Sequence, residues 1–260
     1  MRRELKYLVS EADRDRLYAL VEPYLRPDPH ADGSGRPGYT VRSIYFDTPR
    51  LRDLTQKASG DERRRKVRLR GYDAPGGPVV LEVKRKHGSA VWKDRAPLAP
   101  EAALALIGGA SPEDLAADGR LGARHVEAAR HFGFHLRRDG RRPTLLVTYD
   151  REPLLGRFDP SLRVTLDRRL RCRPYPAFGA DLGGLYTEAG LAPTFRDHFI
   201  LEVKFDRVFP SWLRAMTARL ALRQEALSKY GLGLTAAGRR TPWRLGPPAV
   251  RALSASAGAL

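Results

Sequence analysis

The sequence contains a single cysteine, Cys172, so no disulfide can form within the chain. The same count excludes zinc sites built from several cysteines. Apolar residues never run for the roughly 20 positions that a membrane-spanning helix needs, and charge appears at once in the opening MRRELKYLV. These absences predict a soluble, cytoplasmic protein. Such a protein would reach the inner face of a membrane only through a partner.

Acidic residues are too few to balance the basic ones. Lys and Arg number 47 against 30 Asp and Glu, which gives a formal net charge of +17. An excess of this size predicts an anionic partner: a nucleic acid, a phosphate-rich molecule or polymer, or an anionic membrane surface. The phosphate-binding motif Gly-x-x-x-x-Gly-Lys-Ser/Thr is absent. Nucleotide binding through a P-loop is therefore unsupported.

Short segments of alternating apolar and polar residues predict a β-rich fold with several helices. The predicted strands are Glu4–Val9, Thr40–Asp47, Lys66–Gly71, Val79–Lys86, Thr144–Arg151, Leu162–Asp167 and Phe199–Asp206. The predicted helices are Glu11–Leu25, which Ser10 can cap, Pro100–Ile107, Arg124–Phe132 and Ser211–Lys229. We expect residues 1–238 to form one catalytic domain and residues 239–260, rich in Pro, Gly, Ala and Ser, to form a disordered tail.

Alternate residues of a strand point to opposite faces, and here one face of most strands is charged. The pattern Glu-x-Lys occurs three times on these faces, at Glu4/Lys6, Glu82/Lys84 and Glu202/Lys204. An antiparallel sheet with one solvent-exposed face is one explanation. The alternative is a barrel or tunnel with the charged faces inside, where a chain of phosphates would neutralise the ring of cations.

The glutamates of these patterns require a separate explanation, because a carboxylate repels phosphate unless a divalent cation lies between them. Mg²⁺ and Mn²⁺ bind through one or two carboxylates together with phosphate oxygens. Cations and a metal around a phosphoryl group are what phosphoryl transfer requires. The segment LEVK, present at Leu81–Lys84 and Leu201–Lys204, would then supply one metal ligand and one phosphate ligand.

Seven segments in order resemble the polyphosphate polymerase domain of the vacuolar transporter chaperone (VTC) family. They are ELKYLV, RSIYFDTPRLRDL, KVRLRGY, LEVKRK, RVTLD, LEVKFD and LSKYG, and they cover roughly residues 2–235. That family belongs to the triphosphate tunnel metalloenzymes, together with the CYTH enzymes. The resemblance implies an α+β fold in which an antiparallel β-barrel forms a tunnel and helices pack on the outside.

The resemblance also implies an activity and its residues. Members of the family make polyphosphate from ATP with a divalent metal, typically Mn²⁺, with Mg²⁺ as the alternative. The implied catalytic and phosphate-binding residues are Lys6, Arg68, Arg70, Lys84, Arg163, Lys204 and Lys229. Arg151 and Ser228 are further phosphate-binding candidates. Glu202 is the first candidate for the metal ligand, followed by Glu82 and Glu4, which could instead orient neighbouring lysines.

Three functions remain open at this stage. A polymerase would add the γ-phosphoryl group of ATP to inorganic polyphosphate, whereas a triphosphatase would transfer it to water, and a binding module would hold polyphosphate or inositol phosphates without turnover. CYTH hydrolases usually begin with Glu-x-Glu-x-Lys, but Arg2 replaces the first Glu here, which favours the polymerase. We expect no specific nucleic-acid partner, and a membrane protein as the partner that receives the product.

Overall fold

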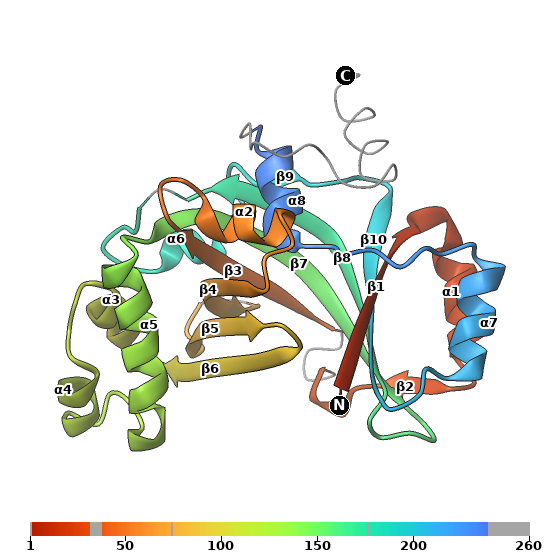
Figure 1. The fold of residues 1–260 in the computed structure, drawn as a ribbon, viewed down its shortest axis with the longest axis horizontal. Coiled ribbons are helices and arrows are strands. Elements are labelled where there is room, and N and C mark those ends of the chain that lie inside the picture. Colours follow the sequence, from red (N-terminus) through yellow and green to blue (C-terminus); the bar gives the residue numbers. More distant parts are fainter. Residues whose placement is uncertain (1, 32–37, 74, 176, 239–260) are drawn as a thin grey trace. The chain divides into compact units, whose positions relative to one another are not determined.

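The structure is a computed structural model that describes residues 2–31, 38–73, 75–175 and 177–238, so the predicted tail lies outside the described part. Figure 1 shows the strands and helices. The strands are β1 (Arg2–Ser10), β2 (Leu25–Pro27), β3 (Tyr39–Asp47), β4 (Arg63–Tyr72), β5 (Val79–His87), β6 (Ala90–Leu98), β7 (Arg142–Gly156), β8 (Arg163–Pro174), β9 (Ala192–Pro193) and β10 (His198–Asp206). The α-helices are α1 (Arg14–Val21), α2 (Arg52–Ala58), α3 (Pro100–Ile107), α4 (Pro112–Ala117), α5 (Val126–Arg138), α6 (Gly183–Tyr186), α7 (Ser211–Arg219) and α8 (Lys229–Ala236). Three 3₁₀ helices, η1 (Glu11–Asp13), η2 (Pro29–Ala31) and η3 (Ala123–His125), complete the described elements.

The strands form one sheet in the order β1-β10-β8-β7-β3-β4-β5-β6, with β2 beside β7 and β9 beside β8. The neighbouring pairs β1/β10, β10/β8, β3/β4, β4/β5 and β5/β6 are all antiparallel. All seven predicted strands are present, with boundaries shifted by a few residues at most except where β7 and β8 continue further. The α+β class and the antiparallel arrangement are therefore confirmed.

The chain divides into two compact units, each assembled from separate segments. Unit 1 comprises Met1–Thr40, Thr148–Arg171 and Pro193–Leu232, and unit 2 comprises Val41–Val147, Cys172–Ala192 and Gly233–Leu260. Strands β7 and β8 run from one unit into the other. The expectation of a single catalytic domain over residues 1–238 stays a prediction.

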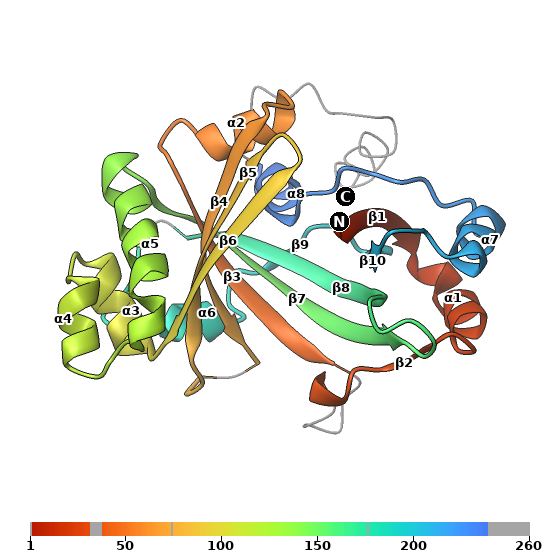
Figure 2. The ribbon, with the colours of Figure 1, turned by 60° about the horizontal axis from the view of Figure 1, so that its bottom comes forward.

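Helices α1 and α7 lie side by side and cover the apolar face of strands β1, β10 and β8 in unit 1 (Figures 1 and 2). Leu17 of α1 and Leu213 of α7 are fully buried in this core together with Leu201 and Val203 of β10. Ser10 accepts a hydrogen bond from the Ala12 N–H at 3.2 Å, so the predicted cap at the start of this helical segment is confirmed. Since the helices occupy the apolar face, the charged face of the same strands stays uncovered by them.

In unit 2 the apolar face of β4, β5 and β6 packs against α3 and α5 (Figure 2). Phe132 of α5 lies edge-on to Phe46 of β3, with the ring centroids 5.5 Å apart. Leu69 and Leu81 of the facing strands are fully buried in the same cluster. The apolar residues of the alternating segments KVRLRGY and LEVKRK therefore lie in a core, as the sequence predicts.

The prediction of one long helix over Ser211–Lys229 is wrong. Helix α7 ends at Arg219, because Ala221 adopts a left-handed conformation with φ of 49°. The Leu222 N–H donates a hydrogen bond to the Thr217 carbonyl at 2.8 Å, and the Ala221 N–H donates one to the Ala218 carbonyl at 3.0 Å. Together these two hydrogen bonds form a Schellman motif. The second helix, α8, begins only at Lys229.

Strand β6 is absent from the predicted elements, and so are the helices α2 and α4. Val91 and Trp92 of β6 are 45% and 49% exposed, and only Ala96 and Leu98 near its end are buried, so the first half of the strand lacks the apolar alternation that marks a buried face. It lies at the end of the strand order, and an edge strand tolerates its residue Pro97. None of the helices within the described residues is both long and apolar enough to cross a bilayer.

Candidate phosphate-binding site

Strands β1, β10 and β8 align their charged residues in two adjacent rows across unit 1. One row consists of Lys6, Glu202 and Thr165, which lie directly opposite one another. The next row consists of Glu4, Lys204 and Arg163. We call these residues, together with Arg151, Asp167 and Lys229, the unit 1 charged face. The antiparallel register thus gathers residues that are up to about two hundred positions apart in the sequence.

Lysines and glutamates alternate around the centre of this face. Lys6 Nζ lies 3.0 Å from Glu4 Oε1 and 3.5 Å from Glu202 Oε2. Lys204 forms ion pairs with the same two carboxylates, a short contact with Glu202 and a longer one with Glu4 at 3.9 Å. Each amine therefore contacts both carboxylates, so the four side chains form a ring of alternating charge.

Asp167 holds two further cations of the face, Arg151 and Lys229. Its carboxylate accepts two hydrogen bonds from Arg151, both of 2.7 Å. It also forms an ion pair with Lys229 at 2.6 Å. Asp167 is completely buried. The aromatic ring of Tyr149 lies beneath both cations, 4.8 Å from Lys229 Nζ and 5.3 Å from Arg151 Cζ. The two cations are therefore fixed in position before any ligand arrives.

The charged face keeps its groups ionised. Burial alone would raise the pKa of Glu202, but Lys229, Lys6 and Lys204 hold that pKa well below its ordinary value. Burial also opposes the ionised form of Asp167, yet Lys229 and Arg151 keep its pKa lowered. For Lys6 the carboxylates of Glu202 and Glu4 outweigh burial and raise the pKa. An entering anion would thus meet cations that are already charged and positioned.

Arg163 and Ser228 have partners outside the ring. Arg163 Nη2 lies 3.3 Å from Asp28, and its side chain is 38% exposed, so it can turn toward a ligand. Ser228 Oγ accepts a hydrogen bond from the Gly231 N–H at 3.4 Å and so caps the start of α8. That cap places Lys229 in the first turn of the helix. A role for Ser228 as a hydroxyl donor to phosphate stays a prediction.

A second cluster of cations surrounds Glu82 in unit 2. Glu82 is buried and pairs with Arg68 at 2.5 Å, Arg95 at 3.0 Å and Arg70 at 3.5 Å. Arg68 also donates a hydrogen bond to the Tyr45 hydroxyl at 3.3 Å, and Arg70 donates one to the Tyr72 hydroxyl at 3.4 Å. One carboxylate therefore orients three guanidinium groups, which we call the arginine cluster.

Next to the arginine cluster, three lysines form a row across β4, β5 and β6. Lys84 lies directly opposite Lys66 on one side and Lys93 on the other. Like charges opposite each other in an antiparallel sheet lower stability. A polyanion bound across the row would remove this repulsion.

The donor chemistry of the unit 1 charged face fits a hard divalent cation. Glu4 and Glu202 contact the same two lysines, so both carboxylates lie on the same part of the face. Within the described residues no group of three or more His, Cys, Asp or Glu could hold a metal by itself. A cation here would therefore use one or two carboxylates and complete its shell with phosphate oxygens and water, as Mg²⁺ and Mn²⁺ commonly do.

The structure brings together most of the residues predicted from the sequence, within their own units. Lys6, Lys204, Glu4 and Glu202 lie in one ring, and Arg151 and Lys229 share Asp167. Arg68, Arg70 and Glu82 meet in the arginine cluster, and Lys84 lies in the lysine row.

Four residues of these clusters are not among the predicted site residues: Asp167, Arg95, Lys66 and Lys93. The alternation of RVTLD places Asp167 on the charged face, which was the available signal. Arg95 could not be found because strand β6 was not predicted.

Solved structures show the class of fold to which this arrangement belongs. One is a candidate adenylate cyclase from Bacillus halodurans, with a TM-score of 0.50 and 14% identity over 86% of this chain and 92% of that chain. Another is the candidate adenylyl cyclase HpAC1 from Hippeastrum, described as having a dominant triphosphatase activity, with a TM-score of 0.50 and 16% identity over 93% of this chain and 98% of that chain. The fold is that of the CYTH-like triphosphate tunnel proteins, which confirms the predicted fold class.

The family follows from the sequence itself. The model of the VTC domain matches residues 1–237, so this chain belongs to the VTC domain family. No curated protein matches it. The resemblance to the VTC family inferred from the seven segments is therefore confirmed.

Proposed function

We propose that the protein is a polyphosphate polymerase that transfers the γ-phosphoryl group of ATP to the end of a growing inorganic polyphosphate chain. The observation that carries the proposal is the unit 1 charged face, where four cations, Lys6, Lys204, Lys229 and Arg151, are held in place by three buried or half-buried carboxylates. Preformed cations suit a ligand whose every unit is negatively charged. Membership of the VTC domain family supports the same assignment.

In this proposal the attacking group is an oxygen of the terminal phosphate of the chain. That oxygen forms a bond to the γ-phosphorus of ATP while the bond from the γ-phosphorus to the β,γ-bridging oxygen breaks, and ADP leaves with the bonding electrons. No protein nucleophile is needed. The lysines and Arg151 reduce the repulsion between two polyanions and hold the reacting oxygens in line, which lowers the barrier without proton transfer.

The carboxylates have two different roles in this proposal. Glu202, with Glu4 beside it, would hold the divalent metal, for which we propose Mn²⁺ in preference to Mg²⁺. The metal, when bound, supplies neutralisation of the charge that develops on the phosphate oxygens. We assign Glu82 and Asp167 to positioning, because Glu82 pairs with three arginines and Asp167 pairs with Arg151 and Lys229.

A triphosphatase is the second candidate function. The Hippeastrum protein with the same fold is described as a triphosphatase, so this fold can direct the phosphoryl group to water. The same residues of the unit 1 charged face would then hold inorganic or nucleoside triphosphate. Arg2, at the position where CYTH hydrolases usually carry the first Glu of their N-terminal motif, favours the polymerase, because fewer carboxylates leave fewer metal ligands for the activation of water.

Product analysis separates these functions. Purified protein is incubated with ATP and Mn²⁺, and the products are followed by ³¹P NMR, with Glu202→Gln as the comparison. We expect ADP together with growing signals from internal phosphates, and a loss of at least about 100-fold in the variant, because the amide neither carries charge nor binds a hard cation well. An equivalent substitution of Asp206, the exposed acidic residue at the end of β10, is the matched control and should leave the rate unchanged.

Each other result assigns a different function. Orthophosphate and ADP without internal-phosphate signals would identify a triphosphatase. Tight tripolyphosphate binding without any turnover, in the wild type as in Glu202→Gln, would identify a binding module and contradict both enzymes.

We also propose the partners of the protein. ATP and polyphosphate are its ligands, and a membrane protein receives the product.

A further inference from the structure

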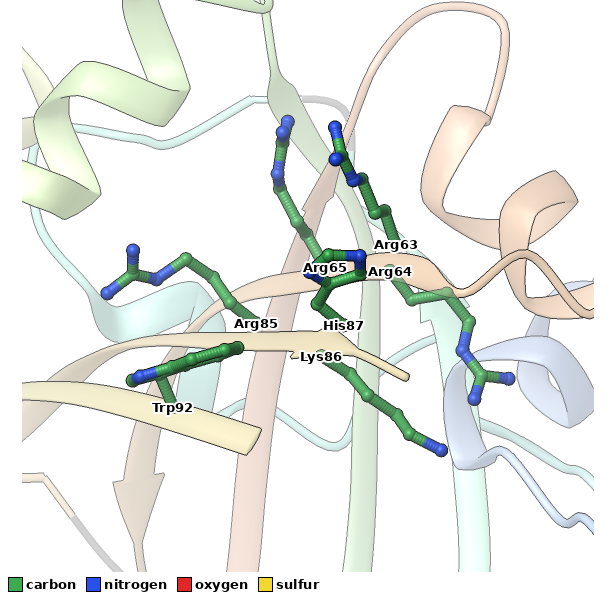
Figure 3. Close-up of a pocket in the computed structure, with 7 residues that line it drawn as sticks. All are labelled: Arg63, Arg64, Arg65, Arg85, Lys86, His87 and Trp92. Carbon is green, nitrogen blue, oxygen red and sulfur yellow. The ribbon is translucent and has the colours of Figure 1, made fainter. Parts of the chain in front are cut away.

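A cavity of about 210 Å³ lies at one end of strands β4, β5 and β6 in unit 2. Figure 3 shows the seven residues that line it, which are Arg63, Arg64, Arg65, Arg85, Lys86, His87 and Trp92. Five of the seven carry a full positive charge at neutral pH, and one is a tryptophan. None of the seven lining residues belongs to the charged face or to the arginine cluster, so the cavity requires its own explanation.

Most of this cavity lies on the opposite face of the sheet from the arginine cluster. Arg63, Arg65 and Arg85 share the parity of the core residues Val67 and Val83, whereas Arg68 and Glu82 have the other parity. Figure 3 shows Arg64 and Lys86 extending away from Arg63 and Arg65, as their parity requires. Five of the seven lining residues therefore lie on the other face of the sheet from the arginine cluster.

The strand register places like charges together in this cavity. Arg65 lies directly opposite Arg85, and Arg64 lies directly opposite Lys86. Like charges directly opposite each other lower the stability of an antiparallel sheet. The next positions on the face of Arg65 and Arg85 are Val67 and Val83, which are apolar and buried.

Nearby carboxylates balance only part of the positive charge. Arg85 pairs with Asp94 at 3.0 Å, although its Nε is buried without a hydrogen-bond partner. Arg65 lies 3.4 Å from Asp139, a carboxylate that Arg141 also contacts at 3.2 Å. Arg63 has no ion-pair partner among the described residues. The lining therefore keeps an excess of several positive charges, comparable to the charge of a triphosphate.

Trp92 adds an aromatic surface to this basic cavity. It lies directly opposite Arg85, and Figure 3 shows its ring beside that side chain. Trp92 is 49% exposed, and no ring or cation in the described part of the chain stacks on it. Exposed tryptophan is unfavourable in water but offers a stacking platform for a nucleobase. Inorganic phosphate chains have no group that would use such a platform.

We propose that this cavity binds a nucleoside triphosphate, with its phosphates on Arg63, Arg65 and Arg85 and its base on Trp92. Guanidinium groups bind phosphate oxygens through paired N–H donors, and the ring of Trp92 lies one strand away from Arg85. The site would be a second nucleotide site, on the opposite face from the arginine cluster. The inference does not depend on polymerase activity.

Isothermal titration of the full chain with ATP in the presence of EDTA, which prevents turnover, tests the proposal. We expect two classes of ATP site in the wild type. Trp92→Ala should weaken the second class about tenfold or more, as loss of base stacking predicts, and should leave tripolyphosphate binding unchanged. Arg63→Gln should weaken the binding of both ligands at this site. The exposed Arg120→Gln, in the same unit, is the matched control and should change neither.

The results that contradict the proposal are equally distinct. A single class of ATP site that neither Trp92→Ala nor Arg63→Gln changes would overturn it. Equal weakening of ATP and tripolyphosphate by Trp92→Ala would show that no base rests on the ring. Trp92-dependent binding to vesicles of anionic lipid, without a second class of ATP site, would assign the surface to a membrane instead.

Discussion

Asp167 shows at the residue scale how a carboxylate can serve a phosphate site without contacting phosphate. It is fully buried, and both Arg151 and Lys229 point their charges at it. Its lowered pKa reflects those two cations, which overcome the effect of burial. Because it is the common anchor of two of the five cations on the charged face, we regard it as a positioning residue for the proposed reaction.

We predict that Asp167→Asn lowers stability and weakens substrate binding together. Breaking a buried ion pair on one side destabilises a protein by about 3–5 kcal/mol, because the partner charge is left uncompensated. Arg151 and Lys229 lose the carboxylate that positions them, so the phosphates are held less tightly. Tripolyphosphate should therefore raise the melting temperature of the variant by less than that of the wild type, while KM for ATP rises.

The comparison that decides this prediction is Asp206→Asn, which removes an exposed carboxylate from β10. It should match the wild type in melting temperature and in KM. An equal stabilisation of Asp167→Asn and wild type by tripolyphosphate would mean that Arg151 and Lys229 do not meet the phosphates. Asp167 would then have a structural role only.

His135, near the end of α5, gives a second prediction at this scale. Burial, with the nearby cations Arg65 and Arg141, lowers its pKa to about 4. As the pH falls below about 6.5 the unfolded chain binds the proton first. Stability is therefore lost between about pH 6.5 and pH 4, by roughly 1–2 kcal/mol after solvent screening.

Urea unfolding at pH 7.5 and pH 5.0 measures this loss. His135→Gln should abolish that part of the loss which comes from this residue, because it has no titrating group. His125→Gln, at a position that is only partly buried, should keep the full loss. Identical pH profiles for the wild type and His135→Gln would show that His135 is as accessible to protons in the fold as in the unfolded chain.

At the scale of elements, the sequence predicted the strands with a buried face and missed those without one. Val203 and Leu201 alternate with charged residues because one side of β10 meets α1 and α7, and that alternation is visible in LEVKFD. Strand β6 meets water over much of its length, so AVWKDRAPL contains no such signal. The register of Lys66, Lys84 and Lys93 could not be predicted either, because it depends on which strands become neighbours.

Helix α7 illustrates a boundary that residue propensity does not reveal. The segment after Arg219 reads LALRQEALSK, which has good helix formers throughout. The helix nevertheless ends, since Leu222 packs against the unit 1 core and Ala221 takes the left-handed conformation that allows the turn. Tertiary packing of one leucine therefore overrides local preference.

We predict that Ala221→Gly stabilises the protein by about 1 kcal/mol, because a left-handed conformation costs an L-residue about 1–2 kcal/mol and costs glycine little. The free energy of unfolding in urea measures the gain. Ala218→Gly, at an exposed position inside the same helix, is the matched control and should instead destabilise by roughly 0.5–1 kcal/mol. Destabilisation by both changes would mean that Ala221 is helical in solution, so that the helix continues as the sequence suggests.

At the scale of the whole molecule, the net charge of +17 divides into groups with different explanations. Many arginines pair with carboxylates at the surface, such as Arg130 with Glu113 and Arg168 with Glu11, and such pairs contribute little to stability. The charged face, the arginine cluster and the lysine row are different, because like charges approach each other there inside a sheet. These groups and the basic cavity of unit 2 predict a polyanionic ligand, which the total charge by itself does not.

The last prediction follows from this division. Tripolyphosphate at about 100 times its Kd should stabilise the folded chain by about 2.7 kcal/mol, because it binds the folded state alone. For a protein of this size the gain corresponds to a rise in melting temperature of roughly 5–10 °C. Raising the salt concentration from about 50 mM to about 500 mM should remove most of that rise, since the cations are partly exposed and become screened. Lys6→Gln combined with Lys204→Gln should reduce the rise at low salt, whereas Arg223→Gln, an exposed residue outside the clusters, should not. If the double variant and the control gave the same rise in melting temperature, the stabilisation would come from the overall charge. The charged face of unit 1 would then not be the site where phosphate binds.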